Sequence, residues 1–283
     1  MPAPPRRPTF TAPSGRGFRN PAAIGGRLRL SGLRDEASIE LDRGPGRVPF
    51  VRWPDFYADF SADFRQGDHV VLMGDTGSGK TVMAVQAVLP QRQFVVVLAT
   101  KRRDRELYPK LEAAGYRTIS RWENPDPERN EEDRKLIFRP PLEAPTDAAK
   151  AAQRAAFQTA LVDIFNTGGW CVFCDEIRYL TDNLGLRTEV ETLYLQGRSL
   201  DISMVAGTQR PVSIPLVAID QARHVFIWQF GDLEDVKRAA QFTGRNYETA
   251  RRLIPLLPEH EALYVAKKSG RMVRTKVDLR EHP

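Results

Sequence analysis

Eight consecutive residues carry the clearest chemical signal in this sequence. The segment from Gly74 to Thr81, GDTGSGKT, fills every fixed position of the phosphate-binding pattern G-x-x-x-x-G-K-[ST]. Gly77 and Gly79 let the backbone curl until successive N–H groups point at phosphate oxygens. Lys80 can then reach the β- and γ-phosphates of a nucleotide, and the Thr81 hydroxyl can bind Mg²⁺. We therefore expect a nucleotide site lined by Gly74, Asp75, Thr76, Gly77, Ser78, Gly79, Lys80 and Thr81.

A second candidate group is a pair of acids at the end of an apolar run. Residues 170–176 read WCVFCDE, so five apolar residues lead into Asp175 and Glu176. Opposite a phosphate loop, Asp175 is predicted to hold Mg²⁺ from the strand end. Glu176 is then placed to polarise an attacking water as general base. Two exposed carboxylates at a strand end would give the same pattern, and the pairing with the phosphate loop favours catalysis.

A third segment runs from a basic residue into an apolar run that ends in polar side chains. It covers residues 197–211, GRSLDISMVAGTQRP. In a doubly wound sheet the carboxyl ends of the strands line the ligand crevice, so Thr208 and Gln209 should face the nucleotide. The neutral amide of Gln209 suits sensing of the γ-phosphate or orientation of the attacking water.

Cys171 and Cys174 form a C-x-x-C pattern within the run that precedes the acids. Residues three apart on a strand face opposite sides, so these thiols cannot easily share a metal ion or form a disulfide. The chain has only two cysteines and four histidines. We expect buried thiols and a cytoplasmic protein.

Short apolar runs predict the elements that position these groups. Most are rich in Val, Ile and Phe and bounded by Gly or polar residues, which suits buried parallel strands. Helical segments lie between them, so the sequence predicts an α/β fold with a mainly parallel, doubly wound sheet. The runs assigned to strands are His69–Met73, Phe94–Ala99, Leu136–Phe138, Trp170–Cys174, Ile202–Ala206 and His224–Trp228.

Two further segments have distinct local signals. Residues 147–166 are predicted to be a helix, with Thr146 as N-cap and Gly168 just beyond its end. Near the C-terminus, residues 262–268 and 271–277 alternate in polarity around a Ser-Gly turn, which predicts a β-hairpin.

The composition bounds the class of protein. With 41% hydrophobic residues among 283, the chain can bury a core. We expect no membrane helix, because no run reaches the roughly 18 apolar residues that such a helix needs, and no secretory signal. Residues 1–52 hold ten Arg and four acidic residues, a balance of +6 that equals the net charge of the whole chain. A basic arm on a neutral body is consistent with nucleic-acid contact, although a general preference for Arg over Lys would produce the same balance.

Composition also suggests three segments. Residues 1–27 are rich in Pro, Gly, Arg and Ser and are expected to form a disordered basic tail. Residues 28–65 are expected to be a small β and aromatic lead-in, whose aromatics over 53–65 have the helical spacing of a packing face. Residues 66–283 are expected to form the main domain, which carries the phosphate loop.

Together the segments GDTGSGKT, VFCDE and GRSLDISMVAGTQRP resemble the FtsK/HerA superfamily of DNA-pumping ATPases. The resemblance covers roughly residues 66–245, and its visible departure is Gly207, where the family has Ala. It implies a RecA-like core, ATP and Mg²⁺ as cofactors, and a hexameric ring that moves DNA, as in packaging and conjugation motors.

The resemblance also implies roles for individual residues. Lys80, Thr81, Asp175, Glu176 and Gln209 take the nucleotide roles given above. Arg198 is the first candidate for an arginine finger that reaches a neighbouring subunit's site, a group worth about 10³–10⁵ in rate in other P-loop enzymes. It could equally be a solvated residue at a helix end, and the other candidates are Arg210, Arg178 and Arg187.

The expected activity is therefore ATP hydrolysis that drives double-stranded DNA through a ring. We expect no membrane anchor, winged-helix module or N-terminal barrel, so docking and DNA choice would come from partner proteins, as in a phage or plasmid motor working in the host cytoplasm. Two alternatives share the nucleotide site. One is a helicase or recombinase on single strands, which should show stacking aromatics on pore loops, and the other is an ATP-dependent assembly switch. Candidate pore loops are 101–133 and 178–187.

Overall fold

The computed structural model describes residues 47–141 and 144–280 of the chain. The expectations for residues 1–27 and 28–46 lie outside these ranges. Among the described residues, no helix combines the length and the apolar character that crossing a membrane requires.

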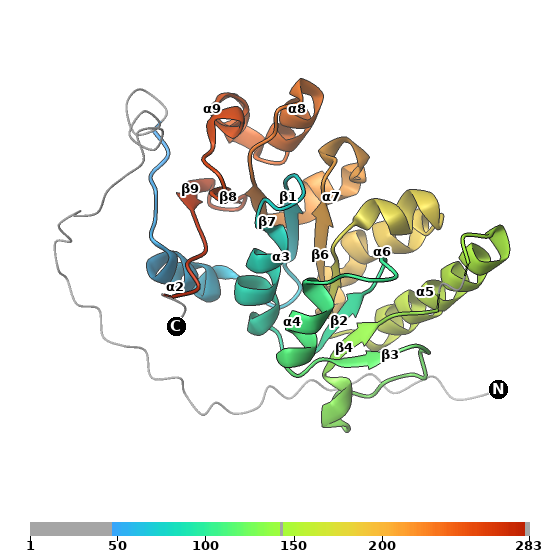
Figure 1. Ribbon diagram of the computed structural model, residues 1–283. Helices are drawn as coiled ribbons and strands as arrows, with labels where there is room; N and C mark the ends of the chain where they lie inside the picture. Colours follow the sequence, from blue (N-terminus) through green and yellow to red (C-terminus); the bar gives the residue numbers. More distant parts are fainter. Residues whose placement is uncertain (1–46, 142–143, 281–283) are drawn as a thin grey trace. The chain divides into compact units, whose positions relative to one another are not determined.

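The described strands form one sheet in the order β3-β4-β2-β5-β6-β1-β7-β8-β9 (Figure 1). All neighbouring pairs from β3 to β7 are parallel, whereas β7–β8 and β8–β9 are antiparallel. The strands are β1 His69–Met73, β2 Val95–Leu98, β3 Arg117–Ile119, β4 Lys135–Phe138, β5 Cys171–Cys174, β6 Ser203–Thr208, β7 Ala222–Ile227, β8 Ala262–Ala266 and β9 Arg271–Thr275.

The predicted fold class is confirmed, with each of the six apolar runs forming a strand and the C-terminal hairpin formed by β8 and β9. The short strand β3 was not predicted. It pairs with β4 at the sheet edge, and its three residues are exposed or half-buried, so it lacks the apolar run that marks the other strands.

Helices cover both faces of this sheet (Figure 1). The α-helices are α2 Trp53–Asp63, α3 Lys80–Met83, α4 Leu107–Ala113, α5 Asp147–Thr167, α6 Arg187–Gln196, α7 Leu216–Gln221, α8 Leu233–Gln241 and α9 Tyr247–Leu253. Two π-helical turns, η1 Ala84–Val88 and η4 Tyr179–Asn183, follow the phosphate loop and the acidic pair. Such turns occur often at functional sites.

Alternate residues of β1 show how the two faces are built. Val71 and Met73 join the core that α5 to α9 cover, whereas Val70 and Leu72 join the core beneath α2, α3 and α4. Every residue of β1 is buried, as expected for a parallel strand with helices on both faces.

The flanking helices follow their sequence signals. Helix α5 begins after Thr146, whose hydroxyl accepts a hydrogen bond from the Ala149 N–H at 3.2 Å, and ends at Gly168. Helix α2 buries Trp53, Phe56 and Phe60 against the sheet, so the aromatic spacing does mark a packing face.

The strand order places three chain segments together. β6 lies between β1, which leads into the phosphate loop, and β5, which leads into Asp175 and Glu176. Strands that run parallel end at the same edge of a sheet, so Gly74, Gln209 and Asp175 emerge side by side.

Candidate nucleotide-binding site

The phosphate loop joins β1 directly to α3. Gly77 and Gly79 have φ angles of 78° and 115°, a region that residues with a Cβ rarely adopt. The first helical turn is followed at once by the π turn η1. The loop therefore has the curled backbone that cradles phosphate oxygens with N–H groups.

Lys80 folds back over this loop. Its ammonium donates to the carbonyl oxygens of Gly74 at 2.6 Å and Asp75 at 2.8 Å, and only 6% of the residue is exposed. Burial lowers the pKa of Lys80, and the charges of Asp175 and Glu176 oppose that shift. A phosphate bound in the loop would replace the two carbonyl oxygens as acceptor of the Lys80 hydrogen bonds.

Thr81 and Asp175 lie close enough to share one cation. The Thr81 hydroxyl is 3.4 Å from Oδ1 of Asp175. Mg²⁺ takes hard oxygen ligands and is commonly bound by one or two protein groups together with substrate phosphates and water. These two side chains fit that role, because they supply a hydroxyl and a carboxylate oxygen beside the loop.

Glu176 is held in place by the end of β6. Its Oε1 accepts from the Thr208 hydroxyl at 3.2 Å, and its Oε2 accepts from the Gln209 N–H at 3.3 Å. Burial raises the pKa of Glu176, and these two hydrogen bonds limit the increase. A carboxylate with fixed orientation and raised proton affinity is suited to accept a proton from water.

The Gln209 side chain connects this strand end to the phosphate loop. Its Oε1 accepts from the Thr76 hydroxyl at 3.0 Å. Gln209 therefore contacts Glu176 through its backbone and the phosphate loop through its amide.

Gly207 brings the strand ends unusually close. A Cβ atom at this position would lie 2.4 Å from the carbonyl oxygen of Asp175. The departure from the family pattern at Gly207 thus coincides with a close approach of β6 to the backbone of the acidic pair.

Two residues near the carboxyl ends of the parallel strands were not predicted from the sequence as site residues. Lys101 follows β2, and its ammonium lies 2.7 Å from Oδ2 of Asp175 and 3.3 Å from Asp104. Burial alone would lower its pKa, but the hydrogen bond and charge of Asp175 raise it. The signal was available, because Lys101 also follows the end of an apolar run.

Trp228 is the second such residue. It follows β7, and its backbone N–H donates to the Met73 carbonyl oxygen at 2.8 Å. Its indole nitrogen would be 3.3 Å from a Cβ at Gly79, and within the described part of the chain this buried nitrogen has no hydrogen-bond partner. Trp228 thus forms the wall behind the phosphate loop.

The candidate arginines occupy different places. Arg198 lies in η5 Gly197–Leu200, which precedes β6, so it is at the amino edge of the sheet, opposite its own phosphate loop. It is 3.8 Å from Asp68, and 60% of its side chain is exposed. Arg210 pairs with Asp235 at 3.0 Å. The remaining two both pair with Asp182, Arg178 at 3.6 Å and Arg187 at 2.7 Å.

Cys171 and Cys174 are free and fully buried, in the cores on opposite faces of the sheet. Burial raises the pKa of the Cys171 thiol to about 12. Both thiols are therefore protonated at neutral pH, and the prediction that they are buried is confirmed.

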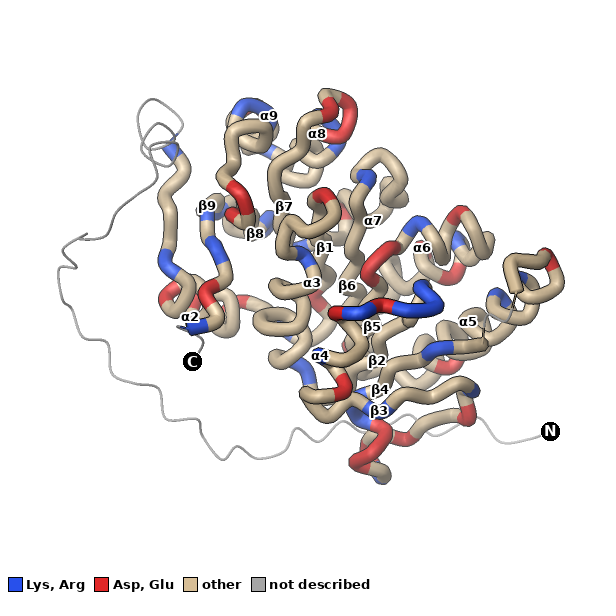
Figure 2. The backbone as a smooth tube through the Cα atoms, viewed as in Figure 1, with Lys and Arg blue, Asp and Glu red and all other residues tan. Residues whose placement is uncertain are grey.

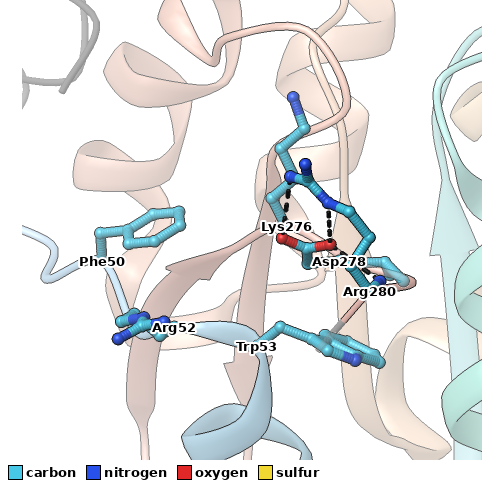
Figure 3. A pocket seen from close by; sticks show the side chains of 7 residues that line it. Phe50, Arg52, Trp53, Lys276, Asp278 and Arg280 are labelled. Atoms are coloured by element: carbon cyan, nitrogen blue, oxygen red, sulfur yellow. Dashed lines mark hydrogen bonds and ion pairs between the residues drawn. The ribbon is translucent and has the colours of Figure 1, made fainter. Parts of the chain in front are cut away.

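A pocket of about 340 Å³ lies between the start of α2 and the segment after β9 (Figure 3). Phe50, Arg52 and Trp53 line it from the start of α2, and the segment after β9 lines its other side. Arg280 folds over Asp278 there, with Nε 3.3 Å from a carboxylate oxygen. The pocket shares no lining residue with the nucleotide site.

A complete phosphate loop beside an acidic strand end, in a mainly parallel sheet covered on both faces, defines the P-loop NTPase fold. Solved structures agree. The genome packaging NTPase B204 from Sulfolobus turreted icosahedral virus 2, in complex with ATP-gammaS, matches with a TM-score of 0.55 and 16% identity, over 76% of this chain and 100% of its own. VirB4 of Thermoanaerobacter pseudethanolicus matches with a TM-score of 0.55 and 13% identity, over 74% of this chain and 89% of its own.

These likenesses show that the chain shares the fold of these proteins. A comparison with protein-family models finds no match, and a comparison with curated proteins finds none either.

Proposed function

We propose that this chain is an ATP-hydrolysing motor that moves double-stranded DNA as a ring, with six subunits. The observation that carries ATP hydrolysis is the position of Glu176, fixed by Thr208 and Gln209 beside a complete phosphate loop. DNA as the substrate is supported by the fold shared with a genome packaging NTPase and by the basic residues near the same edge of the sheet.

The chemistry is in-line attack of water on the γ-phosphate. The loop N–H groups and Lys80 hold the β- and γ-phosphates. Thr81 and Asp175 would hold Mg²⁺, which would supply positive charge beside the phosphate oxygens. Glu176 accepts the proton of the attacking water, and Gln209 orients that water or senses the γ-phosphate.

In a ring, a neighbouring subunit can contribute an arginine that a single subunit does not bring to its own site. Arg198 lies at the sheet edge opposite its own phosphate loop, so any contact with a transferring phosphate must be with a neighbour's site. Its long, 3.8 Å contact with Asp68 leaves the guanidinium accessible. We infer that Arg198 acts in trans, with Arg210 as the rival. The guanidinium of Arg210 is bound more tightly, at 3.0 Å from Asp235, whereas that of Arg198 is 3.8 Å from Asp68.

Steady-state ATP hydrolysis with and without long duplex DNA tests the proposal. A stimulation of about tenfold or more, equal to about 1.4 kcal/mol of barrier, should occur with the wild type and be lost in Lys80→Ala and Glu176→Gln. Stimulation by single strands alone would favour a helicase or recombinase. Hydrolysis that no DNA alters would contradict the motor and favour an assembly switch.

A further inference from the structure

A second cluster of cations lies at the same edge of the sheet, outside the phosphate loop. A pocket of about 330 Å³ opens where β2 and β4 end. Lys101, Arg102 and Arg103 line it from the segment after β2, and Arg139 lines it from the residue after β4. Because β2 and β4 are parallel neighbours, their ends bring these two basic segments together.

The positive charge of this pocket is not cancelled locally. Arg102, Arg103 and Arg139 are exposed, and within residues 47–141 and 144–280 none of them forms an ion pair. The acid nearest in sequence, Asp104, is already engaged by Lys101 and by the backbone N–H groups of Glu106 and Leu107. In Figure 2 the basic stretch after β2 crosses in front of β5.

The lining selects a phosphate rather than a base or a complete nucleotide. Besides the cations, it consists of Ala99, Pro140, Pro141 and the buried amide residue Gln153, and it contains no aromatic ring on which a base could stack. The volume is at the lower end of small-molecule sites. Exposed arginines bind phosphate oxygens in bidentate fashion and read the backbone of nucleic acid without regard to sequence.

Lys101 belongs to both sites. It lines the basic pocket, and its ammonium also donates to Asp175, one of the two side chains placed to hold Mg²⁺. The ammonium and a metal ion compete for the same carboxylate. A phosphate in the pocket would attract the flexible Lys101 side chain and leave Asp175 free for the metal.

We propose that this basic pocket binds a backbone phosphate of nucleic acid, and that Lys101 couples its occupancy to Mg·nucleotide binding at Asp175. The proposal rests on the motor function proposed above and names the residues that would detect DNA. Coupling between two sites is reciprocal, so Mg·nucleotide should increase the affinity for DNA by the same factor as DNA increases the affinity for Mg·nucleotide.

Anisotropy of labelled duplex DNA at several salt concentrations tests the pocket, with the full chain and the triple variant Arg102→Gln/Arg103→Gln/Arg139→Gln. We expect the affinity to fall about tenfold or more, and the slope of log affinity against log salt to become shallower by about 1 for each lost phosphate contact. The control, Arg129→Gln/Arg251→Gln/Arg252→Gln, removes the same charge from exposed positions elsewhere and should change both quantities far less.

The outcomes separate this proposal from the proposed function. If the triple variant binds DNA as the wild type does while DNA still stimulates hydrolysis, the pocket is wrong and the motor function stands. If the wild type neither binds DNA nor responds to it, both fall. If a single-stranded probe alone depends on the three arginines, the pocket stands and duplex DNA as the substrate is wrong.

The role of Lys101 needs a readout other than activity. DNA affinity is measured with and without Mg·ATPγS, and we expect it to rise about fivefold or more in the wild type. Lys101→Gln should abolish this ratio, whereas Lys110→Gln, an exposed lysine on α4, should retain it. A ratio unchanged in Lys101→Gln would overturn the coupling.

Discussion

Charged residues gather at both edges of the parallel sheet, and they are arranged in opposite ways. At the amino edge Asp68 is almost fully buried and is surrounded by Arg223 at 3.2 Å, His224 at 3.6 Å and the Arg65 N–H at 3.0 Å. Burial would raise the pKa of Asp68, yet these partners lower it. The Asp68 carboxylate and the Arg223 guanidinium are thus paired inside the protein.

At the carboxyl edge the same residue types have partners that a ligand could replace. Lys80 donates to carbonyl oxygens, Lys101 occupies a carboxylate suited to a metal, and Arg102 and Arg103 have no acid of their own among the described residues. Charges with fixed partners stabilise the fold, whereas charges with exchangeable partners mark where a ligand binds.

The largest effect is expected when Arg198, a residue at the amino edge, is removed. Arg198→Ala should lower kcat for DNA-stimulated hydrolysis by about 10³-fold or more if Arg198 reaches the neighbouring subunit's site. Mixing this variant with Lys80→Ala subunits should restore activity, because each variant supplies the half that the other lacks.

Arg210→Ala is the matched comparison, since it removes an equally exposed arginine at the carboxyl edge. A large loss there, together with near-normal kcat in Arg198→Ala, would assign the finger to Arg210. It would also leave the amino edge as purely structural.

The next pair of variants separates an effect on the rate of hydrolysis from an effect on the stability of the fold. Glu176→Gln should lower kcat by about 10²–10⁴-fold, because the amide cannot accept the proton of water, while ATP affinity and melting temperature stay near wild type. Glu261→Gln is the control. It alters a buried carboxylate that Arg274 contacts at 2.8 Å, and it should cost about 3–5 kcal/mol of stability with little change in kcat. A normal kcat in Glu176→Gln would remove Glu176 as general base.

A pH prediction concerns the amino edge. His69 is buried, with Nδ1 accepting from the Met204 N–H at 3.0 Å and Nε2 3.1 Å from the Tyr194 carbonyl oxygen, and burial lowers its pKa from 6.5 to about 4. Between these values the unfolded chain binds the proton more readily than the folded one. The stability that His69 contributes is therefore complete above about pH 6.5 and is lost as the pH falls toward 4, by up to about 3 kcal/mol.

Urea unfolding of the wild type and of His69→Gln between pH 5 and 7 measures this effect. The variant should be less stable at pH 7 and should lose less on acidification. Parallel pH profiles for the two proteins would contradict the assignment.

Sequence patterns predicted most of this fold, because buried strands are apolar and bounded by Gly or polar residues, whereas β3 lacks the apolar run and was not predicted. The phosphate loop and the acidic pair were found because their residues are close in sequence. Lys101 lies 74 residues from Asp175, and only the adjacency of β2 and β5 brings the two together. Strand order, which a single sequence does not encode locally, decides such pairs.

The place of Arg198 illustrates the same limit. The sequence puts Arg198 and Gln209 in one motif eleven residues apart, but β6 spans the sheet between them and carries them to opposite edges. Nearness along the chain therefore misleads when a strand lies between two residues.

Gly207→Ala tests how tightly the carboxyl edge depends on backbone position. The new Cβ would lie 2.4 Å from the Asp175 carbonyl oxygen, so β5 must shift at the acidic pair. Overpacking of this kind costs about 1–3 kcal/mol. Because the shift moves Asp175 and Glu176 away from Thr81 and Thr208, kcat should fall as well, by about tenfold.

Gly231→Ala is the matched control, because a Cβ at Gly231 meets open space. It should leave melting temperature and kcat unchanged. If Gly207→Ala is equally silent, the strand ends can relax without loss of alignment, and the close approach of β6 to Asp175 has no part in holding the acidic pair. If stability falls while kcat does not, Gly207 serves packing alone. This part of the carboxyl edge would then stabilise the fold, as the paired charges of the amino edge do.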